Sequence, residues 1–81
     1  MNLATQQSSW EHISTTTDGR PVYLRQLPGD VYLVVTRHPG GPWHWGAKVA
    51  DRGNPQLAHA EGFETDHQAR LSADMWALRT L

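Results

Sequence analysis

The chain has 81 residues, no cysteine, and seven Lys or Arg residues against eight Asp or Glu residues, which gives a formal charge of −1. A chain of this length forms one domain around a single small core. The absence of cysteine excludes disulfides, thiolate metal sites and a cysteine nucleophile. The balanced charge argues against a nucleic-acid-binding protein, which needs a basic excess to neutralise phosphates, and against an acidic nucleic-acid mimic.

The apolar segments are too short for a membrane protein. The longest apolar run, Val31–Val35, has five residues, whereas a membrane-spanning helix needs about 20. The first nine residues have neither the positive charge nor the apolar stretch of a secretory signal. We therefore expect a flexible arm over residues 1–9, one domain over residues 10–81, and a cytoplasmic protein that does not enter a membrane.

The first two predicted strands form a hairpin. The dipeptide Asp18-Gly19 is typical of a tight hairpin turn, because both residues tolerate a positive φ. It separates a predicted strand over residues 10–16 from a second over residues 21–27. Alternation along the first strand places four side chains on one face. These are Trp10, His12, Ser14 and Thr16.

Residues 31–37 form the strongest predicted strand. They are rich in β-branched and aromatic residues and apolar at successive positions, which indicates a central strand with both faces buried. A tight turn over residues 28–30 precedes this strand, and the Pro- and Gly-rich residues 38–42 predict a loop after it. The short, regular spacing of turns predicts an antiparallel meander. Its last two strands take residues 43–51 and 57–63, and a turn over residues 52–55 joins them.

A C-terminal helix is predicted to begin at Asp66. Thr65 is a favourable N-cap, Asp66 places a negative charge in the first turn, and Gln68 completes a capping-box pattern. At ~100° per residue a mostly small-residue stripe follows, which allows close approach to a sheet. Its members are Ala69, Ala73, Trp76 and Ala77.

These elements predict an α+β fold, with an antiparallel sheet of four or five strands and one C-terminal α-helix packed on one face. The sheet side of the core should come from the two central strands, and the helix side from its small-residue stripe. The predicted core residues are Val31, Leu33, Val35, Trp43, Trp45, Ala69, Ala73 and Trp76.

A second apolar stripe lies on the opposite side of the predicted helix. Leu71, Met75 and Leu78 recur at helical spacing, too far round to touch the same surface as the alanines. Either loops and the N-terminal arm cover them, or they form an exposed patch of the kind that marks a protein interface. We take these three residues as the candidate protein-binding site.

No pattern of catalytic or metal-binding residues stands out. The five histidines show no zinc-ligand spacing and are interpreted as surface residues. The Gly40-Gly41 pair precedes no helix and so fails the context of a phosphate-binding loop. Trp43 and Trp45 are interpreted as core residues rather than a base-stacking platform. We expect no enzyme, no cofactor and no metal. The histidines are His12, His38, His44, His59 and His67.

The C-terminal fifty residues carry a resemblance. Trp43-x-Trp45, Ala60-x-Gly62 and Thr65, followed by the helix stripe, resemble a pattern in small proteins of phages and mobile elements. Several anti-CRISPR proteins are similar in size and build. The resemblance covers about residues 31–81 and implies an inhibitor or adaptor that binds a larger protein. It carries over no functional residue.

The sequence therefore favours a non-enzymatic protein-binding inhibitor or accessory factor, acting on a larger host protein or complex such as a CRISPR-type effector. One alternative is a structural homodimer in which the helix stripe pairs with itself. The other is a weak nucleic-acid-binding module in which dispersed basic residues cluster in three dimensions. Those basic residues are Arg20, Arg25, Arg37, Lys48 and Arg52.

Overall fold

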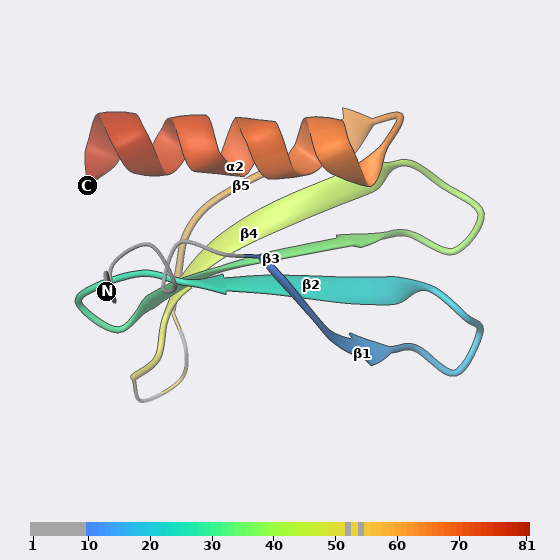
Figure 1. Ribbon diagram of the computed structural model, residues 1–81, viewed down its shortest axis with the longest axis horizontal. Helices are drawn as coiled ribbons and strands as arrows, with labels where there is room; N and C mark the ends of the chain where they lie inside the picture. The colour runs from blue at the N-terminus through green and yellow to red at the C-terminus, as the bar shows by residue number, and fades with distance from the viewer. Residues whose placement is uncertain (1–9, 52, 54) are drawn as a thin grey trace, which may run out of the picture.

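The structure is a computed structural model that describes residues 10–51, 53 and 55–81. The predictions for the arm over residues 1–9 and for Arg52 therefore lie outside the described residues. Five strands form one sheet, and a single described helix lies across one of its faces (Figure 1). The elements are β1 (Glu11–Thr15), β2 (Pro21–Gln26), β3 (Val31–Arg37), β4 (Trp43–Val49), β5 (Gln56–Phe63) and α2 (Asp66–Thr80).

The sheet is an antiparallel meander. Its spatial order is β1-β2-β3-β4-β5, so each strand pairs with its neighbour in the sequence. The predicted α+β class is confirmed, and β3 is the central strand as expected. Tight turns join β1 to β2 and β2 to β3. At the β2–β3 turn, Gly29 and Asp30 have φ values of 78° and 62°, and the Leu27 N–H donates to the Val31 carbonyl at 2.8 Å.

The predicted alternation along the first strand is wrong. His12 lies opposite Tyr23, and Ser14 lies opposite Val22, the neighbouring residue of β2. Because Tyr23 and Val22 point to opposite faces of the sheet, His12 and Ser14 do too. The cause is a register shift between His12 and Ser14, where one extra residue enters the strand as a β-bulge.

The helix begins where the sequence predicts. The Gln68 N–H donates to the Thr65 hydroxyl at 3.1 Å, and the Gln68 side-chain oxygen accepts from the Glu64 N–H at 3.1 Å. This reciprocal pair differs from a standard capping box because the returning side chain reaches the residue before the N-cap. Asp66 pairs with Arg70 one turn later at 2.7 Å.

The core lies between β3, β4 and the alanine stripe of α2. Leu33, Val35, Ala69 and Ala73 are fully buried, whereas Trp43 and Trp76 are partly buried and pack around the core. Trp45 is 4 % exposed, and its indole N–H donates to the Ser72 hydroxyl at 3.0 Å. The predicted core is therefore confirmed, with the two outer tryptophans at its edge.

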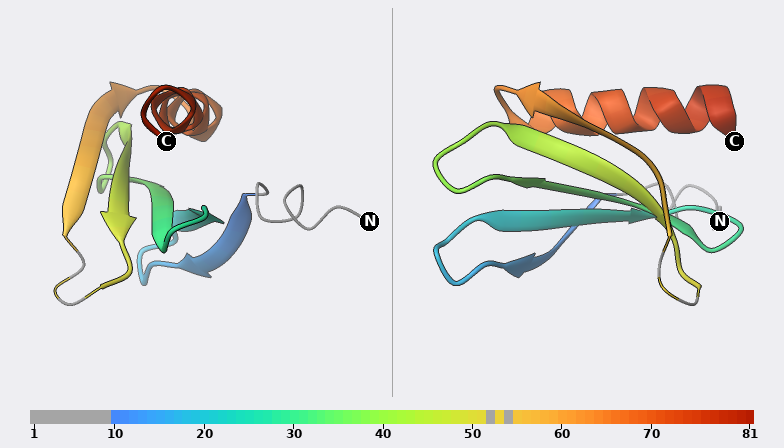
Figure 2. Two further views of the ribbon diagram at one scale, coloured as in Figure 1. Left: turned by 90° about the vertical axis from the view of Figure 1, so that its left-hand side faces the viewer. Right: turned by 180° about the vertical axis from the view of Figure 1, so that it is seen from behind.

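The sheet is curved, and α2 occupies its concave side (Figure 2). The helix contacts β3, β4 and β5, while β1 lies farthest from it. At the edge of the helix, Asp74 accepts from Arg25 of β2 and from the Trp10 indole N–H at 3.2 Å. This carboxylate ties α2 to the half of the sheet that its alanines do not reach.

Enlarging the buried side of the helix should weaken the fold. Ala73→Leu forces extra methylene groups between α2 and the sheet and should reduce the free energy of unfolding by about 1–3 kcal/mol. Urea denaturation followed by tryptophan fluorescence measures this change.

The matched control is Leu71→Ala on the outer side of the same helix, which should change the free energy of unfolding by less than about 1 kcal/mol. Equal losses in the two variants would show that the two helix faces are buried to a similar extent.

Candidate functional site

The outer stripe of α2, defined as Leu71, Met75 and Leu78, faces away from the sheet. These side chains are 51 %, 51 % and 80 % exposed, whereas Ala69, Ala73 and Ala77 on the inner side are at most 8 % exposed. The helix thus buries its alanines and exposes three large apolar residues, the reverse of the usual arrangement, while Trp76 packs at the edge of the core. The structure therefore places all three candidate residues together on one accessible surface.

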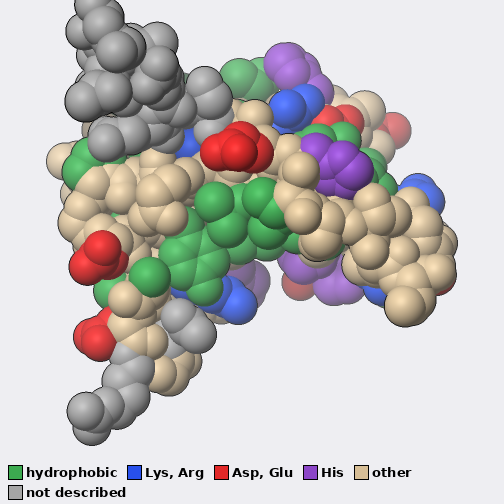
Figure 3. All heavy atoms as spheres, turned by 60° about the horizontal axis from the view of Figure 1, so that its bottom comes forward, with side chains coloured by type: hydrophobic (Ala, Val, Ile, Leu, Met, Phe, Trp, Pro, Cys, Tyr) green, Lys and Arg blue, Asp and Glu red, His purple; other side chains and the backbone are tan. Residues whose placement is uncertain are grey.

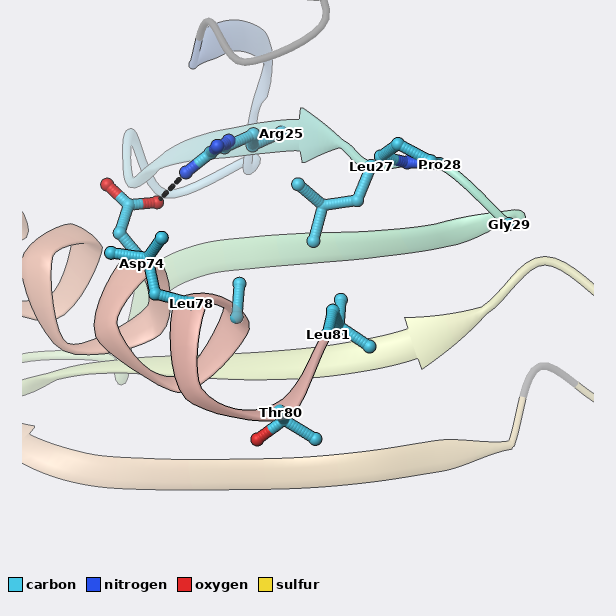
Figure 4. Close-up of a pocket in the computed structure, with 9 residues that line it drawn as sticks. Arg25, Leu27, Pro28, Gly29, Asp74, Leu78, Thr80 and Leu81 are labelled. Carbon is cyan, nitrogen blue, oxygen red and sulfur yellow. Dashed lines mark hydrogen bonds and ion pairs between the residues drawn. The ribbon is translucent and has the colours of Figure 1, made fainter.

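The outer stripe ends at a groove beside the C-terminal end of α2 (Figure 4). The groove has a volume of about 630 Å³ and lies between the helix and the β2–β3 turn. Leu78 belongs to both the outer stripe and the groove, so the two form one continuous apolar surface. The groove residues are Arg25, Leu27, Pro28, Gly29, Asp74, Ala77, Leu78, Thr80 and Leu81.

The charged pair in the groove is structural. Arg25 and Asp74 form an ion pair across the groove wall, and the Trp10 indole lies within 3.3 Å of both Asp74 oxygens. The Asp74 carboxylate therefore accepts hydrogen bonds from two side chains that lie far from it in the sequence. The rest of the groove lining is mostly apolar, with Leu27, Pro28, Ala77, Leu78 and Leu81 among its residues.

Two histidines form a pair on the other side of the molecule. The His38 and His44 rings stack with centroids 4.2 Å apart, and the nearest Glu61 oxygen lies 3.5 Å from His38 Nε2. Burial lowers the pKa of His44, and the neighbouring His38 lowers it further. Within the described part of the chain, no three His, Asp or Glu side chains converge to hold a metal ion.

Of the basic residues named for nucleic-acid binding, the structure brings Arg20 and Arg37 together and separates Arg25 from Lys48. Arg25 pairs with Asp74 on the helix side of the sheet, while Lys48 pairs in register with Tyr32 on the opposite face. Arg20 pairs with Asp18 at 2.9 Å, and its guanidinium also donates to the Arg37 carbonyl. Trp45 is buried under the helix, so it offers no base-stacking surface. Arg37 lies over the partly exposed Trp43 ring, 6.0 Å from its centroid, so among the described residues the basic and aromatic groups that meet are Arg20, Arg37 and Trp43, and not the full set predicted.

The sequence analysis missed the open face of the sheet, which points away from α2. Its central side chains are Val22, Leu24, Tyr32 and Val34, all of them partly exposed. The sequence contained the information needed to predict this open face. β3 is apolar on both faces, and the single predicted helix can cover only one of them. The central strand was instead interpreted as buried on both sides.

No described helix has the length and apolar character needed to cross a membrane. Comparison with protein families, curated proteins and solved structures found no match to this chain.

The histidine pair makes stability depend on pH. Because the folded-state pKa of His44 is lowered, the unfolded chain binds more protons below about pH 6.5. Stability should therefore be greatest above that pH and fall as the pH decreases toward the folded-state pKa. The nearby Glu61 opposes this effect, while Arg20 and His59 reinforce it.

Urea denaturation between pH 7.5 and pH 5 tests this expectation. His44→Gln should flatten the dependence of the free energy of unfolding on pH. The control His67→Gln, on the exposed surface of α2, should leave that dependence unchanged. The pKa of Asp18 is lowered by hydrogen bonds from Thr16 and Arg20, and its contribution is lost only below its ordinary value of 3.8. An identical slope in His44→Gln and the wild type would contradict the assignment.

Proposed function

We propose that this chain is a non-enzymatic protein-binding module whose contact surface is the outer stripe of α2 together with the adjoining groove. The observation that supports the proposal is the inverted helix, with three alanines buried and Leu71, Met75 and Leu78 at least half exposed. Large apolar side chains gathered on one accessible surface are typical of interaction sites.

The free energy gained by burying these side chains is large enough for a specific protein contact. Fully burying a Leu or Met side chain contributes about 1.5–3 kcal/mol, and 1.4 kcal/mol changes a dissociation constant about tenfold. The outer stripe and Leu81 can therefore anchor a partner through a few residues, as is usual at protein interfaces. The groove beside Leu78 extends that contact toward Leu27 and the β2–β3 turn.

The partner that fits this surface presents an apolar groove or helix face. An amphipathic helix binds such a partner through residues at i, i+4 and i+7, the spacing of the outer stripe. The sequence predicts that the partner is a larger host protein, such as a CRISPR-type effector in the cytoplasm. This stays a prediction, and the binding experiment below includes it.

A second copy of the chain is the alternative partner. The intervals of four and three residues between Leu71, Met75 and Leu78 are those of a coiled-coil seam. Two helices packed about a two-fold axis would bury both stripes at once.

Met75→Asp should abolish partner binding and leave the fold intact. A charge at the middle of the stripe opposes desolvation, so retention should fall at least about tenfold, while the free energy of unfolding changes by less than about 0.5 kcal/mol. The measurement is the amount of partner that the immobilised protein retains, from a lysate of the source cells and from a solution of purified CRISPR effector. The mass of the protein in solution is measured in parallel by light scattering.

Two variants serve as controls. Met75→Leu keeps the apolar volume and should retain binding. Ile13→Asp introduces the same charge at a side chain that is 50 % exposed on β1, and it should also retain binding. Loss of folding in Met75→Asp, or equal retention by Met75→Asp and Ile13→Asp of every captured protein, would overturn the proposal.

A further inference from the structure

The open face of the sheet, on the side away from α2, carries one row of residues that crosses all the strands. Its central member lies on β3, and the others lie in pairs, one strand and two strands away on either side. In Figure 3, hydrophobic side chains gather in the middle of this face, with acidic, Lys and His side chains around them. In order from β1 to β5, the row is Glu11, Leu24, Val34, Gly46 and His59.

The two halves of this row are complementary to each other. One strand away from β3, the large side chain of Leu24 on β2 is matched by Gly46 on β4, beside which lies a hollow of about 180 Å³. Two strands away, the acid Glu11 on β1 is matched by His59 on β5. Such a row fits a second copy of itself in reverse order, because each residue then meets its complement.

The hollow beside Gly46 suits an aliphatic side chain. A Cβ built on Gly46 would lie 3.6 Å from the Gln56 side-chain oxygen and 4.0 Å from the Ala58 carbonyl oxygen, which are ordinary contacts for a carbon atom. An anion in the same space would meet two acceptor oxygens. Gly46 is not among the glycines with a positive φ, and glycine within a strand often marks the close approach of another backbone.

Both ends of the row have groups available for a partner. Glu11 is exposed and has no ion-pair partner among the residues that the structure describes. The Gln56 amide nitrogen lies 2.9 Å from Nδ1 of the exposed His59. Because that amide nitrogen can only donate, the His59 proton lies on Nε2, which leaves an N–H that can donate to a carboxylate.

We propose that two copies of this chain pack open face against open face, about a two-fold axis that runs along β3. Val34 then lies opposite the partner's Val34, and Leu24 enters the hollow beside the partner's Gly46. At the edges, the Glu11 carboxylate lies opposite the partner's His59 and accepts from its Nε2–H. The product is an aligned sandwich of two sheets with one α2 on each outer side, so the two outer stripes face in opposite directions.

Charge complementarity selects this axis. A two-fold axis across the strands, through the same row, would place Glu11 opposite its own copy, which is unfavourable. The axis along β3 also suits the adjacent row of the sheet, Gln26–Tyr32–Lys48, because Tyr32 meets its own copy and Lys48 meets a neutral Gln26. Since the sheet curves around α2 (Figure 2), the open face is convex and the contact is centred on β3. We therefore expect a weak dimer with a micromolar dissociation constant.

The test is the mass of the purified protein, measured by sedimentation velocity over a range of concentrations. The wild type should pass from monomer to dimer as the concentration rises. Gly46→Val fills the hollow and should raise the dimer dissociation constant at least about tenfold. Met75→Asp, on the outer stripe, should leave the dimer unchanged, so that failure of this proposal is distinguishable from failure of the helix surface.

A charge exchange tests the axis independently of folding. Glu11→Lys removes the acceptor, and His59→Glu places two acids opposite each other, so each variant alone should weaken the dimer at least about fivefold. The double variant restores an opposite pair across the interface and should recover the wild-type dissociation constant to within about twofold. Glu64→Lys, at an exposed position before α2, makes the same exchange of charge outside the interface and should have no effect.

Three results would overturn the proposal. The first is a monomer at every concentration. The second is a dimer that Met75→Asp dissociates and Gly46→Val does not, which would assign self-association to the helix. The third is a folded double variant that associates no better than either single variant, because the two residues would then not face each other.

Discussion

The close contact between the alanine stripe of α2 and the sheet is the constraint on which the rest of the structure depends. Ala69 and Ala73 have no exposed surface, and they lie over Leu33, Val35 and Trp45. Small side chains let the helix axis approach the strands, and the dense core of a short chain leaves little room for larger ones. Leu71, Met75 and Leu78 of the same helix therefore lie on its outer side, where they form the surface proposed for binding, whereas Trp76 packs at the edge of the core.

The same constraint explains the open face of the sheet. A chain of 81 residues with one described helix covers one side of a five-stranded sheet, and the other side of β2 and β3 meets solvent. Two apolar surfaces thus lie on opposite sides of one thin domain. On the helix side, Asp74 joins α2 to Arg25 of β2 and to Trp10, and the open face takes no part in these contacts.

Features set by local sequence were predictable, and features set by distant contacts were not. The start of α2 at Asp66 follows from Thr65 and Gln68, and the central place of β3 follows from its apolar composition. The bulge in β1 depends on how that strand meets β2, so alternation alone gave the wrong face for Ser14. The two partners of Asp74, Arg25 and Trp10, lie 49 and 64 residues away in the sequence, and no local pattern identifies them. The outer stripe was predictable because it needs only helical spacing, whereas the neighbours on the open face depend on the register of Gly46 against Val34 and His59.

The most direct test of the inverted helix is the solvent accessibility of individual methyl groups in the free protein. A soluble paramagnetic agent added to a methyl-labelled sample should strongly broaden the NMR signals of Leu71, Met75 and Leu78, and leave those of Ala69 and Ala73 sharp. Protection of the three large side chains at a concentration where the chain is monomeric would contradict the account, because these side chains would then belong to the core.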